Sequence, residues 1–209
     1  MQDPKCKICR RAGEKLFLKG ERCYSPKCSI IRRPYPPGPK GKRRKGRPSE
    51  YSRQLAEKQK LKKWYGLREA QFSKYAKKAM AELGKVEDTS ALLVQMLEMR
   101  LDNVVYRMGF TLSRVKARQM VSHGYFLVNG RSSNIPSRRL RVEDEIALKP
   151  NKKNKAIVKE INRILEKTDA PSWLEVDKKE LKGKVVGVPT KEEASLPVQI
   201  SSIFEFYSR

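Results

Sequence analysis

Four cysteines near the amino terminus are the residues whose type and spacing could do chemistry. Cys6 and Cys9 form one close pair, and Cys23 and Cys28 form a second pair after a gap long enough for a hairpin or loop. Two such pairs are typical of thiolates that converge on one tetrahedral zinc ion. The spacing therefore predicts one closed, structural Zn²⁺ site, which stabilises a segment too short to bury a core.

Two disulfides, an iron–sulfur cluster and free thiols are the alternatives to zinc. Disulfides are disfavoured in the reducing cytosol, where we expect this chain. Redox catalysis fits poorly, because the one histidine of the chain, His123, lies far from the cysteines. Basic neighbours such as Lys5, Lys7 and Arg10 are expected to lower the pKa of the thiols and so to favour metal binding.

The net charge of the chain indicates a polyanionic partner. Its 209 residues include 48 Lys plus Arg and 23 Asp plus Glu, which gives a formal charge of +25. Such a charge excludes most ordinary soluble enzymes and favours nucleic acid or an anionic membrane as the partner. No segment approaches the roughly 20 apolar residues of a membrane span, and no apolar signal-peptide core is present. We therefore expect a cytoplasmic protein with no membrane contact and no homo-oligomer.

A basic arm follows the cysteines and a proline-rich run at 34–39. The basic arm cannot bury its charges, so it either orders on RNA phosphates or remains a solvated tail. The basic residues of this arm that we expect to bind RNA are Lys40, Lys42, Arg43, Arg44, Lys45 and Arg47.

Three helical patterns come next. Ser49 is a candidate N-cap for a helix over 50–65, which Gly66 would end. Apolar residues then recur at helical spacing over 72–83, and another apolar face continues over 92–108. These patterns predict two or three helices that pack against one another.

A helix-turn-helix and a hairpin are expected between residues 101 and 148. Ser113 is a candidate N-cap for a helix over 114–123, in which Arg114 and Arg118 share one cationic face opposite a buried face. A strand over 125–128, a type I′ turn and a return strand at Arg131 would follow, with a further short strand at 146–148.

This region resembles the S-four RNA-binding domain. The residues that carry the resemblance are 101–109, 113–114, 117–119, 123–124 and 128–130. A helix-turn-helix on a small sheet suits shape-directed contact with RNA. The residues expected to bind RNA here are Arg100, Asn103, Arg107, Ser113, Arg114, Lys116, Arg118, Gln119, His123 and Arg131.

The flanking segments are similar to the bacterial small-subunit ribosomal protein S-four family, in its zinc-knuckle form. They comprise the cysteine pairs and residues 19–23, 33–38, 57–61, 196–198 and 205–209. The resemblance implies a primary binder of small-subunit ribosomal RNA at a multi-helix junction of the 5′ domain, which nucleates assembly of the subunit body. It also implies an effect on decoding accuracy and a place beside the channel by which messenger RNA enters.

The carboxyl-terminal third carries little net charge. A helix is expected over 155–167, and short strands or turns follow it. Residues 170–209 contain equal numbers of basic and acidic side chains, so this segment suits core closure or a protein neighbour better than RNA. By resemblance, Glu205 and Tyr207 would contact ribosomal protein S-five, although an ordinary capping tail is the alternative.

The expected fold class is α+β, with a mainly helical first domain, an amino-terminal zinc knuckle and an inserted S-four domain on a small antiparallel sheet. The expected divisions are 1–48 for the knuckle and arm, 49–98 for the helical domain, 99–160 for the S-four domain and 161–209 for a segment that packs back on the helical domain. An enzyme is disfavoured, because His123 lacks catalytic partners and no glycine-rich phosphate loop is present. DNA binding is disfavoured, because nothing suggests a dimer with spaced half-sites.

Overall fold

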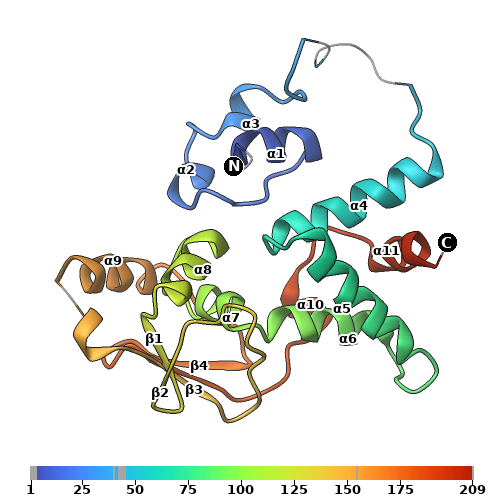
Figure 1. The fold of residues 1–209 in the computed structure, drawn as a ribbon. Coiled ribbons are helices and arrows are strands. Elements are labelled where there is room, and N and C mark those ends of the chain that lie inside the picture. Colours follow the sequence, from blue (N-terminus) through green and yellow to red (C-terminus); the bar gives the residue numbers. More distant parts are fainter. Residues whose placement is uncertain (1–3, 40, 42–45, 154, 209) are drawn as a thin grey trace. The chain divides into compact units, whose positions relative to one another are not determined.

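The computed structural model describes residues 4–39, 41, 46–153 and 155–208 (Figure 1). The chain divides into two compact units. The first comprises residues Met1–Leu93 and Leu196–Arg209, and the second comprises Val94–Ser195. The segment 161–195 therefore belongs to the second unit, and only residues from Leu196 onwards return to the first.

The first unit begins with three short helices around a small apolar core. These are α1 Lys5–Ala12, α2 Glu21–Tyr24 and α3 Ser29–Arg32. The buried core residues are Cys9, Leu16 and Leu18, against which Trp64 packs. A core of this size buries too little apolar surface to stabilise a fold alone. This cysteine module, residues 4–33, therefore depends on additional contacts.

Longer helices form the rest of the first unit. Helix α4 Glu50–Trp64 begins at Ser49, whose Oγ accepts a hydrogen bond from the Ser52 amide at 3.3 Å. This confirms the predicted N-cap. Helix α5 Glu69–Ala81 follows, and the carboxyl-terminal helix α11 Ile200–Tyr207 packs against both α4 and α5.

The apolar stripe of α5 ends earlier than the sequence predicts. Phe72, Ala76 and Ala79 are buried, as expected. Leu83 is 71% exposed because α5 ends at Ala81, so the residue lies in the turn beyond the helix. Leu83 therefore lies outside the buried stripe, although the helical spacing over 72–83 includes it.

The second unit packs helices against one antiparallel sheet. Helix α6 Thr89–Glu98 leads into it, and α7, α8 and α9 lie on the same side of the sheet in Figure 1. The strand order is β2-β1-β3-β5-β4, and every neighbouring pair is antiparallel. The elements are α7 Leu101–Arg107, α8 Arg114–Ser122, β1 Phe126–Val128, β2 Arg131–Ser133, β3 Glu145–Leu148, the short 3₁₀ helix η1 Pro150–Lys152, α9 Lys155–Leu165, β4 Leu174–Asp177, β5 Lys182–Val185 and α10 Lys191–Ala194.

The expected apolar face over 92–108 belongs to two helices. Arg100 adopts an extended backbone conformation between α6 and α7. The loop 136–140 occupies the break, where the Leu101 amide donates to Arg138 O at 2.9 Å and the Leu140 amide donates to Met99 O at 2.8 Å. Pairing with a distant loop therefore interrupts a pattern that is locally helical.

The predicted hairpin is present. Asn129 and Gly130 both have positive φ values, 51° and 74°, which a type I′ turn requires at its two central positions. β1 pairs with β2 on one side and with β3 on the other. The sheet is larger than the sequence predicts, since β4 and β5 extend it beyond β3.

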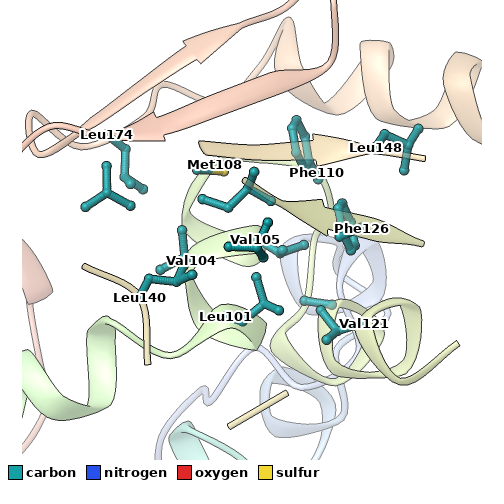
Figure 2. Packing of buried hydrophobic residues seen from close by; sticks show 14 of the residues in the cluster. Leu101, Val104, Val105, Met108, Phe110, Val121, Phe126, Leu140, Leu148 and Leu174 are labelled. Carbon is teal, nitrogen blue, oxygen red and sulfur yellow. The ribbon is translucent and has the colours of Figure 1, made fainter. Parts of the chain in front are cut away.

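The core of the second unit lies between the helices and the sheet. Figure 2 shows Leu101, Val104 and Val105 of α7 in one cluster with Phe126 and Leu148 of the sheet. All five side chains are at most 2% exposed. This packing fixes the position of α7. The next helix along the chain, α8, carries several of the residues expected to bind RNA.

Candidate nucleic-acid interface

Helix α8 begins at a well-defined cap. The Ser113 Oγ accepts a hydrogen bond from the Lys116 amide at 3.3 Å, and Ser113 itself is buried. Capping satisfies an amide that would otherwise lack a partner at the helix start. Ser113 therefore fixes the helix rather than reaching RNA with its side chain.

A buried carboxylate joins α6, α7 and α8. Glu98 is fully buried, and its Oε2 accepts hydrogen bonds from Asn103 Nδ2 at 2.7 Å and from Arg107 Nε at 2.8 Å. The Arg107 Nη2 donates to the other carboxylate oxygen at 2.9 Å and to Ala194 O at the same distance. We call Glu98, Asn103, Arg107 and Arg114 the Glu98 network.

Arg114 belongs to the interior of the protein. Its Nε donates to Asn103 Oδ1 at 2.8 Å, and its guanidinium lies 4.4 Å from the centre of the Tyr106 ring. Only 7% of its side chain is exposed, with Glu98 within 4.0 Å. The prediction that Arg114 shares an exposed cationic face with Arg118 is therefore wrong for Arg114, because its charge neutralises a buried carboxylate.

A second buried pair lies beside this network. Arg100 is 1% exposed and donates to both carboxylate oxygens of Asp102, at 3.1 and 2.9 Å. Arg118 Nη1 lies 3.5 Å from the same carboxylate and remains partly exposed. Burying a charge is costly unless it is paired. Arg100, like Asn103, is therefore a positioning residue, and the expectation of direct RNA contact does not hold for either.

The exposed side chains that remain from the prediction lie on α8 and the hairpin. Gln119, His123 and Arg131 are exposed, while Lys116 and Arg118 are half-buried. Lys116 forms an ion pair with Glu160 of α9. These five residues form the surface that can reach RNA, and we call them the α8–hairpin surface.

The basic arm is only partly described. Arg47 is exposed. The predicted residues Lys40, Lys42, Arg43, Arg44 and Lys45 lie outside the described residues.

The four cysteines are free thiols, and Cys9, Cys23 and Cys28 are buried. Burial raises the pKa of Cys9, and the charges of Cys23, Cys6 and Cys28 raise it further. The expectation that basic neighbours lower this pKa is therefore wrong for Cys9, because burial dominates. In the part of the chain that the structure describes, no three Cys, His, Asp or Glu side chains form a group able to hold a metal ion.

The expected protein-contact residues are engaged within the first unit. The Tyr207 hydroxyl donates to Glu69 Oε1 at 2.9 Å, and Gln54 Nε2 donates to Glu205 Oε2 at 2.9 Å. Partial burial opposes ionisation of Glu69, but hydrogen bonds from Lys58, Lys62 and Tyr207 outweigh it and lower its pKa to about 2. Burial and the bond to Glu69 raise the pKa of Tyr207. These contacts hold α11 on α4 and α5.

The acidic partners Glu98, Asp102 and Glu69 are not among the residues that the sequence pattern predicts to be functional. A signal exists for Glu98, since it is an acid at the end of the largely apolar segment 91–97. Acids in such positions are rarely buried without a cationic partner.

Within the described ranges, no helix is long and apolar enough to span a bilayer.

Comparison with known proteins shows two matching family models. Residues 1–98 match the ribosomal protein S4/S9 N-terminal domain, and residues 99–146 match the S4 domain. Full-length relatives are also similar, and each bears the name small ribosomal subunit protein uS4. The relative from Ruminiclostridium cellulolyticum is 51% identical over 207 residues, which cover 99% of this chain and 98% of the relative. The relative from Thermus thermophilus is 46% identical, over 99% of this chain and 97% of the relative. The relative from Thermodesulfovibrio yellowstonii is 49% identical, over 98% of this chain and 96% of the relative.

Proposed function

The chain belongs to the uS4 family of small ribosomal subunit proteins, the S-four family, and we propose on this basis that it binds small-subunit ribosomal RNA and nucleates assembly of the subunit body. It is a structural protein of the cytoplasmic small subunit and not an enzyme. The RNA site that we propose is a multi-helix junction in the 5′ domain of that RNA.

The observation that carries this proposal is the rigid support beneath the α8–hairpin surface. Ser113 caps α8, and the Glu98 network joins α8 to α6 and α7 through hydrogen bonds of 2.7 to 2.9 Å. A surface fixed before binding loses little conformational freedom on RNA. The formal charge of +25 adds a long-range attraction to phosphates.

A primary binder recognises naked RNA without other ribosomal proteins. The test is a gel-shift titration of the purified chain with isolated small-subunit ribosomal RNA, with an equal mass of large-subunit ribosomal RNA as control. We expect tight binding to the first RNA and at least about 10³-fold weaker binding to the second, as specific complexes usually show. Equal affinities for both RNAs would contradict the proposal.

We also propose that Cys6, Cys9, Cys23 and Cys28 hold one structural Zn²⁺ ion. The residues fit this ion in donor type, since all four are free thiols, three of which are buried. The charges of the other three cysteines raise the pKa of Cys9, so the four side chains are electrostatic neighbours, although no three of them form a ready-made metal group within the described residues. The Lys19 amide points at Cys23 Sγ at 3.4 Å, a donor that stabilises a thiolate. The ion would crosslink a module whose own core is small.

A protein neighbour is proposed for the carboxyl-terminal helix. Glu205 of α11 is exposed apart from its bond to Gln54, and the segment 170–209 is neutral. We propose ribosomal protein S-five as this neighbour, an influence on decoding accuracy through it, and a place beside the channel by which messenger RNA enters. Crosslinking from position 205 in reconstituted subunits tests this contact, and a crosslink to RNA alone would contradict it.

A further inference from the structure

A cavity of about 230 Å³ opens between α8 and α9 of the second unit. Its floor is apolar and includes Phe110, Ile157 and Ile161. Phe110 is held rigidly, since it is 1% exposed and stacks on Phe126 at 5.9 Å between ring centres with planes 3° apart. The cavity is therefore a formed feature of the core edge, and it is smaller than the roughly 300 Å³ at which pockets for drug-sized ligands begin.

The mouth of the cavity carries groups that form hydrogen bonds and stack. Gln119 of α8 and His123, the residue after α8, are exposed there, and Tyr125 lines the cavity with them. Lys116 and Glu160 form an ion pair across the mouth, from α8 and α9 respectively. An amide, an imidazole, a phenol and a carboxylate thus surround an apolar floor.

This combination suits a nucleobase better than a phosphate. Unstacked bases of RNA are recognised by aromatic stacking and by hydrogen bonds to their edges. Glu160 would repel a phosphate, whereas its carboxylate can accept from an exocyclic amino group, as acidic side chains do with cytosine. Lys152 lies 5.3 Å from the centre of the Tyr125 ring and places a positive charge near the mouth. The sugar–phosphate backbone can therefore pass outside while the base enters.

We propose that this cavity binds one unstacked nucleobase of the ribosomal RNA, a base that carries an exocyclic amino group. The proposal rests on the proposed function, because it names a nucleotide within the RNA that the chain binds. In this proposal Gln119 and His123 form hydrogen bonds with the edge of the base. Lys116 pairs with Glu160 and is therefore not available to a phosphate.

The test is chemical probing of small-subunit ribosomal RNA in complex with the full chain and two matched variants. Gln119→Trp places an indole over the mouth, and Ser122→Trp places the same group on an exposed position of α8 that does not line the cavity. Dimethyl sulfate reports adenine and cytosine, and kethoxal reports guanine. Circular dichroism checks that both variants fold.

We expect one base to be protected by the wild-type chain and by Ser122→Trp, and to regain reactivity with Gln119→Trp while the remaining footprint persists. The dissociation constant should rise about fivefold for Gln119→Trp only, which corresponds to the loss of one stacked base. An unchanged footprint with Gln119→Trp would overturn the proposal and leave the proposed function intact. A wild-type chain that protects no RNA would overturn both.

A third variant separates base recognition from charge. Glu160→Gln removes a negative charge, so electrostatics alone predicts equal or tighter RNA binding. If the Glu160 carboxylate recognises an amino group, Glu160→Gln should instead make the one base in the cavity more reactive to the chemical probe. The protection of the other nucleotides should stay the same or increase. Undiminished protection of that base by Glu160→Gln would contradict the role of the carboxylate.

Discussion

The Arg107 guanidinium donates to both carboxylate oxygens of Glu98, with Nε to Oε2 at 2.8 Å and Nη2 to Oε1 at 2.9 Å. This two-point contact fixes direction as well as distance. Asn103 of α7 also donates to Glu98, and Arg114 of α8 donates to Asn103 and lies within 4.0 Å of Glu98. The carboxylate therefore determines how α8 lies on α7. The exposed face of α8 is thus oriented by residues that are buried or mostly buried.

Removing the Glu98 carboxylate should destabilise the second unit severely. Glu98→Ala leaves Arg107 and Arg114 without their buried counter-charge, and breaking such pairs costs about 3–5 kcal/mol. Urea unfolding measures the loss, and hydrogen exchange locates it in α7 and α8. Glu180→Ala is the matched control, since Glu180 forms an exposed pair with Lys182 and should cost less than about 1 kcal/mol. Equal small losses for the two variants would refute a structural role for Glu98.

Exposed and buried arginines should affect RNA binding in different ways. Arg131→Ala removes an exposed charge, so the slope of log K against log salt should shrink by about 0.9 with no loss of stability. Arg114→Met should lower the unfolding temperature and leave that slope unchanged, because the buried guanidinium does not release counterions. Filter binding at several salt concentrations measures both. The assignment fails if Arg114→Met shrinks the slope as much as Arg131→Ala.

The cysteine module should depend on metal. Elemental analysis of the purified chain is expected to give one zinc per molecule, and Cys9→Ser should release it because one of four ligands is lost. Residues 4–33 should then become accessible to protease, while the sheet of the second unit keeps its exchange protection. Ser29→Ala, a neighbouring change that removes no thiol, is the control. Native protein with no zinc would refute the site.

Acid should weaken the docking of α11. The pKa of Glu69 falls from an ordinary value of 4.5 to about 2 in the folded chain, so its stabilising contribution is complete above about pH 4.5 and is lost as the pH falls towards 2. Denaturant unfolding at pH 5 and pH 3 should show this loss in the wild type. Glu69→Gln should reduce the difference between the two pH values, whereas Glu166→Gln, at an exposed site, should not. A wild-type difference that persists in Glu69→Gln would contradict this assignment.

Local signals predict most of the elements that form the interface. The caps at Ser49 and Ser113 and the turn at Asn129 depend on the nearest few residues, and all three are present. The break at Arg100 was not predictable in this way, because its partners lie in the distant loop 136–140. Helical pattern alone favoured continuation there.

The charge pattern misleads at Arg114 for a related reason. The helical periodicity places Arg114 and Arg118 on one face of α8. It cannot show that Asn103 and Glu98 lie against Arg114 on that face. Only the fold brings these groups together, and it converts an expected RNA contact into a support. Gln119 and His123, which are also expected to bind RNA, are exposed.

Footprinting of the purified chain on naked small-subunit ribosomal RNA tests the central claim most directly. The proposed function predicts protection of one multi-helix junction in the 5′ domain, at chain concentrations that leave the rest of the RNA reactive. Protection spread along the RNA, or confined to a site outside the 5′ domain, would contradict it.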